Sequence, residues 1–403
     1  ADTRHDDLLA LEARSGKLLW RQPLGEPIES EALVHRGRIY QPTAAGNVVV
    51  LEAATGRLLG RIQLGKQRLS TAPVADRTGK FIYVLGEQFN MYVLDVSNTP
   101  RCRQVYYIGH RPETIQASPL RIGRYIVLCE NYIEEESAKC RIRVLLISAA
   151  GAELKELQSQ VVRGWVHHPP AVSGNTLIVA TDLGIVVLYS AGPPEKEAGL
   201  RALHLLPTQQ AGNGPRGQAY AYMYTSRDVL VAGLKVRHFQ IKTEESQLGR
   251  PKDLFDGPAS QPIQASPRTG AVKALFVACR QLDSSAVRVY AIDASSLKLG
   301  WQTLLGDKPI AVMHTGRAKQ LAVLTLGGNL FNVAAEQLTG HATVPKPTDR
   351  VQWPVELASL HPTLTMPDGT RVYTPSGSPR SLLVSSAADG SGQKPLRLPE
   401  RLA

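Results

Sequence analysis

The sequence lacks any long hydrophobic run. Although 43% of its 403 residues are hydrophobic, no stretch approaches the roughly 20 consecutive apolar residues that a membrane-spanning helix needs. No transmembrane segment is therefore expected. The first residues, ADTRHDD, also lack the basic and apolar regions of a signal peptide. We expect this chain to be a mature form or a segment of a longer precursor.

Cysteine is scarce, and its spacing excludes two classes of site. The four cysteines, Cys102, Cys129, Cys140 and Cys279, are too few for a disulfide-built scaffold and contain no C-x-x-C pair for zinc or redox chemistry. Cys129 and Cys140 flank the segment NYIEEESAK, which is typical of a hairpin turn between two strands. They are interpreted either as unpaired core thiols or as a cross-strand disulfide, and both alternatives stay open.

The familiar catalytic motifs are also absent. The sequence contains no G-x-S-x-G, H-E-x-x-H, G-x-x-x-x-G-K-[ST] or G-x-G-x-x-G pattern. His167 and His168 are adjacent, but successive side chains of a strand point to opposite faces, so the two imidazoles do not readily bind one ion. We expect one of them in a polar ring and the other between sheets. Neither a metal site nor a catalytic residue is predicted.

Positive charge is in excess but scattered. The chain carries 46 Lys and Arg against 35 Asp and Glu, a net charge of +11. Such an excess attracts polyanions without specificity, and it does not by itself indicate a nucleic-acid site. Because no dense basic run with neighbouring aromatic residues is present, no specific nucleic-acid binding is predicted.

The sequence does contain a repeat of 40 to 50 residues. The segment LLALEARSGKLLWRQPLG (8–25) recurs as VVVLEAATGRLLGRIQLG (48–65), with looser copies at 90–109 and 288–306. Each copy consists of a short apolar run, a glycine-containing turn and a second apolar run, which predicts two antiparallel strands. Two further strands precede each copy, as in ALVHRGRIYQPT (32–43). The repeat therefore predicts units of four strands.

A second repeated pattern allows the units to be counted. An apolar residue, a polar residue and two small residues recur where each first strand begins, at Glu29, Ser70, Gln116, His167, Gln218, Gln264, Ala311 and Ser359. The units end after Gly25, Gly65, Gly109, Gly164, Pro207, Phe255, Gly306 and Pro347. We therefore predict an all-β fold, a single-domain eight-bladed β-propeller of four-stranded antiparallel blades over residues 1–403. The strands of residues 8–25 would close the last blade, which leaves no open sheet edge. Seven blades is the alternative, because residues 375–393 match the repeat least well.

The repeat motif resembles that of a known family. The pattern A-L-[DE]-A-x-[ST]-G-x-x-x-W, carried by Ala10 to Trp20 and echoed by Ala291 to Trp301, is similar to the repeat of quinoprotein-type (PQQ-like) β-propellers. The units at 8–25, 48–65 and 288–306 carry the resemblance best. The resemblance implies that Trp20 and Trp301 are structural and pack between adjacent blades.

The resemblance also raises the question of a quinone cofactor. Family enzymes hold pyrroloquinoline quinone against a tryptophan, commonly beside a disulfide between adjacent cysteines, with calcium bound by acidic and amide side chains. This sequence contains no Cys-Cys pair, and Glu29 is the one acidic residue among the eight strand starts. One glutamate among amides is a poor calcium cage. The resemblance is therefore to a noncatalytic, BamB-like branch, with no cofactor. A PQQ- or metal-dependent oxidoreductase with an atypical site is the alternative.

In a propeller the starts of the inner strands line one mouth of the central channel. The candidate ligand-binding residues there are Glu29, Ser70, Gln116, His167, Gln218, Gln264 and Ser359. They are mostly neutral donors and acceptors, which suit a peptide or glycan better than acid–base catalysis. We predict a protein-interaction or ligand-sensing scaffold whose partners are proteins, envelope- or membrane-associated ones included. The resemblance implies a periplasmic or extracytoplasmic location in a bacterium. A carbohydrate-binding propeller is a further alternative, favoured if Tyr132, Tyr220, Tyr222 and Tyr224 gather at one mouth.

Overall fold

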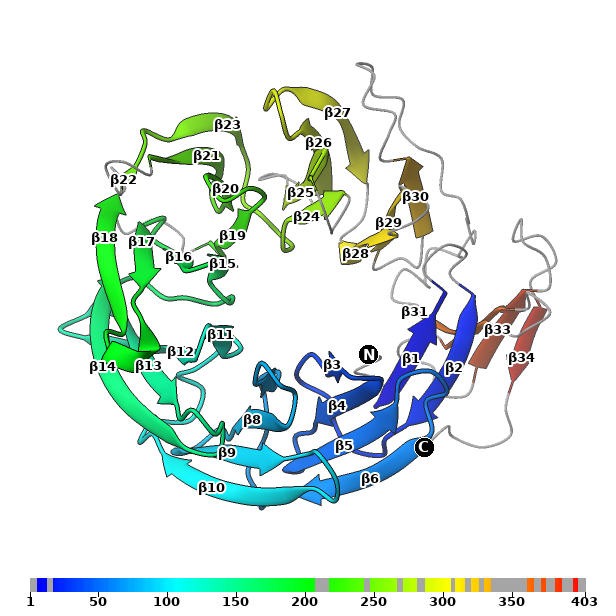
Figure 1. The fold of residues 1–403 in the computed structure, drawn as a ribbon. Coiled ribbons are helices and arrows are strands. Elements are labelled where there is room, and N and C mark those ends of the chain that lie inside the picture. Colours follow the sequence, from blue (N-terminus) through cyan, green and yellow to red (C-terminus); the bar gives the residue numbers. More distant parts are fainter. Residues whose placement is uncertain are drawn as a thin grey trace. The chain divides into compact units, whose positions relative to one another are not determined.

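The protein is built almost entirely of antiparallel β-strands (Figure 1). The structure is a computed structural model, and it describes the backbone of residues 6–12, 17–206, 217–242, 247–266, 271–280, 287–305, 309–315, 320–325, 330–334, 361–365, 371–374, 381–385 and 394–397, with side chains described up to Thr303. It divides into two compact units. Unit 1 comprises Ala1–Ala10 and Trp20–Asp253, and unit 2 comprises Leu11–Leu19 and Leu254–Ala403.

The described residues of unit 1 form five sheets of four or five strands that are consecutive in the sequence, besides one hairpin. Sheet 1 contains β3 (Leu33–His35), β4 (Arg38–Pro42), β5 (Asn47–Glu52) and β6 (Leu58–Gln63). Sheet 2 contains β7 (Val74–Ala75), β8 (Phe81–Leu85), β9 (Asn90–Asp95) and β10 (Arg101–Tyr107). Sheet 3 contains β11 (Leu120–Ile122), β12 (Tyr125–Glu134), β13 (Ser137–Ile147) and β14 (Leu154–Arg163).

The remaining sheets of unit 1 follow the same order. Sheet 4 contains β15 (Ala171–Ser173), β16 (Thr176–Ala180), β17 (Val186–Ala191) and β18 (Leu200–Leu206), with a short 3-10 helix, η1 (Pro194–Lys196), before its last strand. Sheet 5 contains β19 (Tyr220–Met223), β20 (Asp228–Ala232), β21 (Lys235–Lys242), β22 (Gln247–Leu248) and β23 (Lys252–Asp256). A separate hairpin, β1 (Asp7–Leu11) and β2 (Leu18–Pro23), precedes them.

Unit 2 repeats this plan. Sheet 6 contains β24 (Gln264–Ser266), β25 (Ala274–Arg280), β26 (Val287–Asp293) and β27 (Leu299–Leu305). Sheet 7 contains β28 (Pro309–Thr315), β29 (Gln320–Thr325) and β30 (Leu330–Ala334). Sheet 8 contains β31 (His361–Thr365), β32 (Arg371–Thr374), β33 (Ser381–Ser385) and β34 (Lys394–Arg397).

The predicted all-β fold of antiparallel sheets is confirmed, and most of the described sheets have the expected four strands, whereas sheet 5 has five and sheet 7 has three. Sheets 1 to 6 each end within two residues of a predicted boundary, as at Gln63, Tyr107 and Leu305. The boundary after Pro347 falls outside the described residues. The number of blades, the single domain and the closure of the last blade by residues 8–25 stay predictions.

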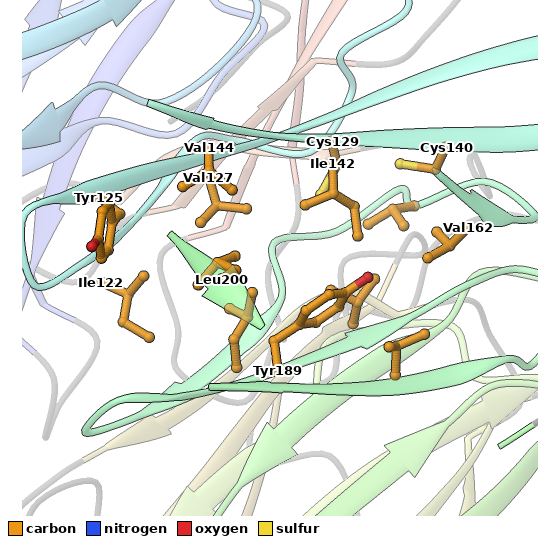
Figure 2. Close-up of a cluster of buried hydrophobic side chains, with 14 of the residues drawn as sticks. Ile122, Tyr125, Val127, Cys129, Cys140, Ile142, Val144, Val162, Tyr189 and Leu200 are labelled. Atoms are coloured by element: carbon orange, nitrogen blue, oxygen red, sulfur yellow. The ribbon is translucent and has the colours of Figure 1, made fainter. Parts of the chain in front are cut away.

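Neighbouring sheets of unit 1 pack face to face, and the hydrophobic core lies between them. Tyr125 and Val144 of sheet 3 pack in one cluster with Tyr189 and Leu200 of sheet 4 (Figure 2). Similar clusters join sheets 1 and 2, sheets 2 and 3, and sheets 4 and 5. Middle strands therefore bury both faces, which explains why they read as apolar runs such as VVVL in β5 rather than as alternating patterns.

Two of the cysteines lie within the core of unit 1, near each other on β12 and β13 (Figure 2). The strand register pairs Cys129 with Ile142 and Cys140 with Asn131, so the two thiols lie diagonally and not directly opposite each other. Both are free and buried. Of the two alternatives drawn from the sequence, the structure shows unpaired core thiols. The hydrogen bond with Cys129 is the larger cause that raises the pKa of the Cys140 thiol, and burial raises it further.

Trp20 docks β2 onto sheet 1, as the family resemblance implied. Its indole Nε1 donates a hydrogen bond to the carbonyl oxygen of Ala53 at 3.1 Å. Gly56, in the turn between β5 and β6, has a φ of +72°, and a Cβ added there would lie 2.5 Å from the indole ring. The glycine of the repeat motif is therefore needed both for the turn and for the approach of the tryptophan. Trp301 is buried beside Phe276 in sheet 6.

Sheet 3 also contains a buried ion-pair network. The carboxylate of Glu130 on β12 accepts a hydrogen bond from Arg143 Nε at 2.8 Å, and Arg143 Nη1 donates to Glu156 at 3.1 Å and to the carbonyl oxygen of Ile108 at 3.1 Å. Burial acts to lower the pKa of Arg143, but its bonds to Glu130 and Glu156 outweigh that effect and raise it. The network joins β12, β13 and β14 to the end of sheet 2.

Candidate functional site

Most of the predicted mouth residues share one local structure. Five of them follow a buried apolar residue, namely Ile28, Leu69, Ile115, Val166 or Ile263, whereas Gln218 follows Gly217. Because side chains of extended backbone alternate in direction, the next residue points away from the core. Glu29, Gln116 and Gln218 are exposed, and Ser70, His167 and Gln264 are partly exposed. Ser359 lies outside the described residues.

Glu29 belongs to a cluster around one arginine. Arg68 Nη2 lies 2.6 Å from Glu29 Oε2, and Arg68 Nη1 lies 3.4 Å from Glu87 and 3.9 Å from Glu113. The hydrogen bond and the charge of Glu29 raise the pKa of Arg68. The backbone of Glu87 also donates to the carbonyl oxygen of Arg68 at 3.0 Å. Arg68 therefore links the loop before β3 to the loop between β8 and β9.

Gln116 and His167 contact each other across sheets 3 and 4. His167 Nδ1 lies 2.7 Å from Gln116 Oε1, and His167 Nε2 lies 4.0 Å from Asp182 Oδ2. Asp182 is fully buried as a side chain, and its Oδ1 accepts a hydrogen bond from the backbone of Trp165 at 2.7 Å. Two of the predicted mouth residues, Gln116 and His167, are therefore direct neighbours.

His168 occupies a different environment, between sheets 4 and 5. Its ring stacks on Tyr220 with 4.1 Å between centroids, and Tyr220 Oη donates to Gln218 Oε1 at 2.6 Å. Burial lowers the pKa of His168 to about 4, and a hydrogen bond with Gln218 opposes this in part. The second histidine is therefore neutral near neutral pH and packs against the predicted mouth residue Gln218.

Two other predicted mouth residues lie apart from these clusters. Ser70 is half-buried before β7, and Gln264 begins β24 in unit 2.

The sequence did not predict the residues that pair with the mouth residues, namely Arg68, Glu87, Asp182 and Tyr220. A weak signal for Arg68 exists, because it directly precedes the apolar residue of the repeated pattern. Asp182 and Glu87 lie in loops between middle strands, where the repeat pattern contains no information.

The described residues of this region fit a quinone–calcium site poorly. Calcium needs several oxygen ligands, and uncompensated carboxylates supply most of the charge. Here Glu29, Glu87 and Glu113 already surround the guanidinium of Arg68. Within the part of the chain that the structure describes, no group of three or more His, Cys, Asp or Glu side chains could hold a metal ion. Of the four tyrosines considered for a glycan site, Tyr220 and Tyr224 are buried.

A pair of exposed aromatic residues lies next to the Arg68 cluster. Phe89, in the loop between β8 and β9, stacks on Tyr107 at the end of β10 with 6.0 Å between ring centroids and 18° between planes. The side chains are 40% and 69% exposed. Phe89 has a φ of +57°, which is unusual for a residue other than Gly, Asn or Asp. Its carbonyl oxygen accepts hydrogen bonds from Ile108 and from Gly109, the latter at 3.0 Å.

The Arg68 cluster holds this aromatic pair in place. Glu87 is bound by Arg68 through both side chain and backbone, and the backbone of Gln88 donates to Gln67 Oε1 at 3.1 Å. Phe89 is the next residue, so its loop is fixed from two sides. Exposed apolar rings on a rigid support are typical of protein-binding surfaces, in which Tyr and Phe are enriched. The repeat pattern did not predict this pair, because an isolated Phe in a loop is not part of any periodic pattern.

Comparisons with known proteins agree with the fold. A family model described as outer membrane protein assembly factor BamB matches residues 2–101. BamB from Moraxella catarrhalis is 14% identical over 72% of this chain and 74% of that chain, with a TM-score of 0.45. Sqt1 from Saccharomyces cerevisiae is 10% identical over 93% of this chain and 96% of that chain, with a TM-score of 0.57. No curated protein matches the sequence.

The family match covers the part of the sequence in which the repeat is clearest. Residues 2–101 include the copies at 8–25 and 48–65 and the tryptophan Trp20. The similarity to Sqt1, at low sequence identity, concerns the fold alone. The family match confirms the resemblance to the PQQ-like β-propeller family that the repeat motifs predicted.

None of the helices in the described part of the chain has the length and apolar character needed to span a membrane.

Proposed function

We propose that this chain is a noncatalytic PQQ-like β-propeller that binds a protein partner in the bacterial cell envelope. The observation that carries the proposal is the exposed stack of Phe89 and Tyr107 on a loop braced by Arg68. The family model that matches residues 2–101 is described as an outer membrane assembly factor, which supports an extracytoplasmic protein-binding role. The two aromatic side chains would supply the apolar anchor of the interface.

The mouth residues support binding rather than catalysis. Glu29 is paired with Arg68 and Gln116 with His167, so their polar groups hold neighbouring loops together, whereas Gln218 pairs with Tyr220 on its own segment. We propose that this pairing makes the loops rigid, which lowers the entropy lost on binding. Gln116 and His167, together with Ser70 of the same unit, would border the binding face.

Site-specific photocrosslinking tests the proposal. A benzophenone side chain replaces Tyr107 in one variant and Leu205 in a matched variant, because Leu205 is a similarly apolar residue, 48% exposed, on β18 of unit 1. Cells are irradiated, and crosslinked proteins are identified by mass spectrometry. We expect position 107, and not position 205, to capture a defined envelope protein. Capture of the same proteins at both positions would contradict the proposal.

Binding of the purified partner then measures the contribution of the aromatic pair. Phe89→Asn introduces a residue that tolerates positive φ, and Tyr107→Thr retains a β-forming residue, so the double variant should fold. Loss of an interface anchor of about 2 kcal/mol or more corresponds to roughly 30-fold weaker binding. Leu205→Ala serves as the control and should bind unchanged. An unchanged affinity in the double variant would rule out this surface.

A further inference from the structure

A small polar pocket lies at the other loops of sheet 2, away from the aromatic pair along the strands. It is formed by the turn between β7 and β8, which contributes Lys80, and by the end of β9, the following turn and β10. Its volume is about 180 Å³, and its lining residues are Lys80, Asp95, Ser97, Asn98, Thr99, Arg101 and Arg103. All of them are polar, and three are cationic. The pocket is smaller than the 300–1,000 Å³ sites typical of drug-sized ligands, so a small polar group is the fitting occupant.

The one carboxylate in the pocket is already satisfied. Asp95 Oδ1 accepts hydrogen bonds from the backbone and hydroxyl of Ser97 at 3.1 and 2.6 Å, and Asp95 Oδ2 lies 3.0 Å from Arg103 Nη2. The hydroxyl of Ser97 is the main cause that lowers the pKa of Asp95 to about 2, so the group stays ionised. Because Arg103 neutralises it, Asp95 acts as an internal brace of the turn.

Two cations of the pocket are not bound to a carboxylate, although the charge of Lys80 contributes to lowering the pKa of Asp95. Among the residues that the structure describes, neither Lys80 nor Arg101 forms an ion pair, whereas Arg103 does. Lys80 lies over the ring of Phe81, with 5.2 Å from Nζ to the ring centroid. Arg38 adds positive charge at the edge of the pocket, where its Nη1 donates to the carbonyl oxygen of Val96 at 3.3 Å. The pocket therefore has a net positive charge beside neutral hydrogen-bond donors.

This arrangement departs from the repeat. In the corresponding turn of sheet 1, the backbone of Glu52 pairs with Arg57, and the side chain of Arg57 lies 3.5 Å from the carboxylate of Glu52. Sheet 1 has a β-bulge at Leu59 and sheet 2 has one at the equivalent position, Arg103. In sheet 2, Asp95 pairs with Arg101 in the strand register, but the residue at the bulge is a second arginine, and it binds the carboxylate instead. The turn is also one residue longer. A bulge redirects the side chain at its extra residue, and because that residue is an arginine in sheet 2, Asp95 is bound by Arg103 and Arg101 is left available.

We propose that this pocket binds a phosphate group, either as free phosphate or as the headgroup of an anionic phospholipid. An ammonium group, a guanidinium fork and the side chains of Asn98 and Thr99 match the oxygen acceptors of a tetrahedral oxyanion. The excess of two cations over the neutralised Asp95 favours a doubly charged phosphate over a singly charged carboxylate. This site goes beyond the proposed protein-binding function and shares no residue with the Phe89–Tyr107 pair.

Calorimetric titration of the intact chain with inorganic phosphate tests the site. Lys80→Gln and Arg101→Gln each remove one unpaired cation. The matched control is Arg201→Gln. Arg201 is an exposed arginine near the start of β18, the fourth strand of sheet 4, and Arg101 has the equivalent position at the start of β10, the fourth strand of sheet 2. Loss of one charged hydrogen bond corresponds to roughly tenfold weaker binding or more. We expect that loss in the first two variants and unchanged affinity in the control, with circular dichroism showing that all three are folded.

Vesicle sedimentation distinguishes the two sources of the phosphate group. Vesicles of phosphatidylglycerol are compared with vesicles of phosphatidylcholine, with the same three variants. Binding to phosphatidylglycerol, lost in Lys80→Gln and Arg101→Gln and kept in Arg201→Gln, identifies a lipid headgroup. Binding of inorganic phosphate with that variant pattern, without vesicle binding, identifies the free anion. Equal loss in all three variants, which the net charge of +11 alone would produce, or no binding of either probe, overturns the proposal.

Discussion

The buried ion pair of Glu130 and Arg143 allows a quantitative test of how sheet 3 is stabilised. The side chain of Glu130 is 8% exposed and that of Arg143 is 12% exposed. Breaking a buried pair by removing one partner costs about 3–5 kcal/mol, because the remaining charge is uncompensated. In Glu130→Gln the amide still accepts one hydrogen bond, and Arg143 keeps Glu156 and the carbonyl oxygen of Ile108. We therefore expect a loss of about 2 kcal/mol.

The control and the assay follow from the same geometry. Glu134→Gln removes the carboxylate that pairs with Lys139 at the exposed end of β12, where water and salt screen the ion pair and it contributes little to stability. Hydrogen exchange of peptides covering β12 and β13 measures local stability without assuming that the whole chain unfolds in one step. The double variant Glu130→Met/Arg143→Met should be at least as stable as the single variant, because no buried charge remains unpaired. Equal losses in Glu130→Gln and Glu134→Gln would refute this reasoning.

Three further predictions follow from glycine, histidine and cysteine. Gly56→Ala should destabilise the chain by about 2 kcal/mol more than Gly37→Ala in urea unfolding, since both glycines have a φ of +72° but only an added Cβ at Gly56 meets Trp20. His168 has a pKa of about 4 in the folded chain, so the unfolded chain takes up its proton first as the pH falls. Stability should therefore decrease by no more than about 3 kcal/mol between about pH 6.5 and 4, and His168→Gln should reduce that decrease in melting experiments. Iodoacetamide should label the exposed Cys102 in the folded chain, and the three buried thiols only after unfolding, as peptide mass spectrometry would show.

The ion pair of Arg68 with Glu87, which holds the loop that carries Phe89, leads to a further prediction. Arg68→Gln should weaken partner binding although it removes no apolar contact, because the loop that carries Phe89 loses its ion pair with Glu87. The double variant of Arg68→Gln with Phe89→Asn should then bind no more weakly than Phe89→Asn alone, since the brace acts through the ring. Additive losses would show instead that Arg68 contacts the partner directly.

The strand plan could be predicted from the sequence because it depends on local patterns. The glycine turns, the apolar runs and the buried residue before each inner strand recur at fixed spacing, and each of these has a short-range physical cause. This is why the ends of sheets 1 to 6 were predicted to within two residues. The docking role of Trp20 followed from the resemblance and is consistent with its contact to Ala53.

The partners of the candidate site were decided only by tertiary structure. Arg68 and Glu29 are 39 residues apart, and Gln116 and His167 are 51 residues apart, so which polar groups meet depends on how neighbouring sheets stack. The stack of Phe89 on Tyr107 and the arginine at the bulge of sheet 2, Arg103, are departures from the repeat, and a repeating pattern does not predict its own exceptions. The sequence by itself determined the strands and their turns, through local periodicity. Only the folded chain decided which loop residues meet, because those contacts form between segments that no local pattern connects.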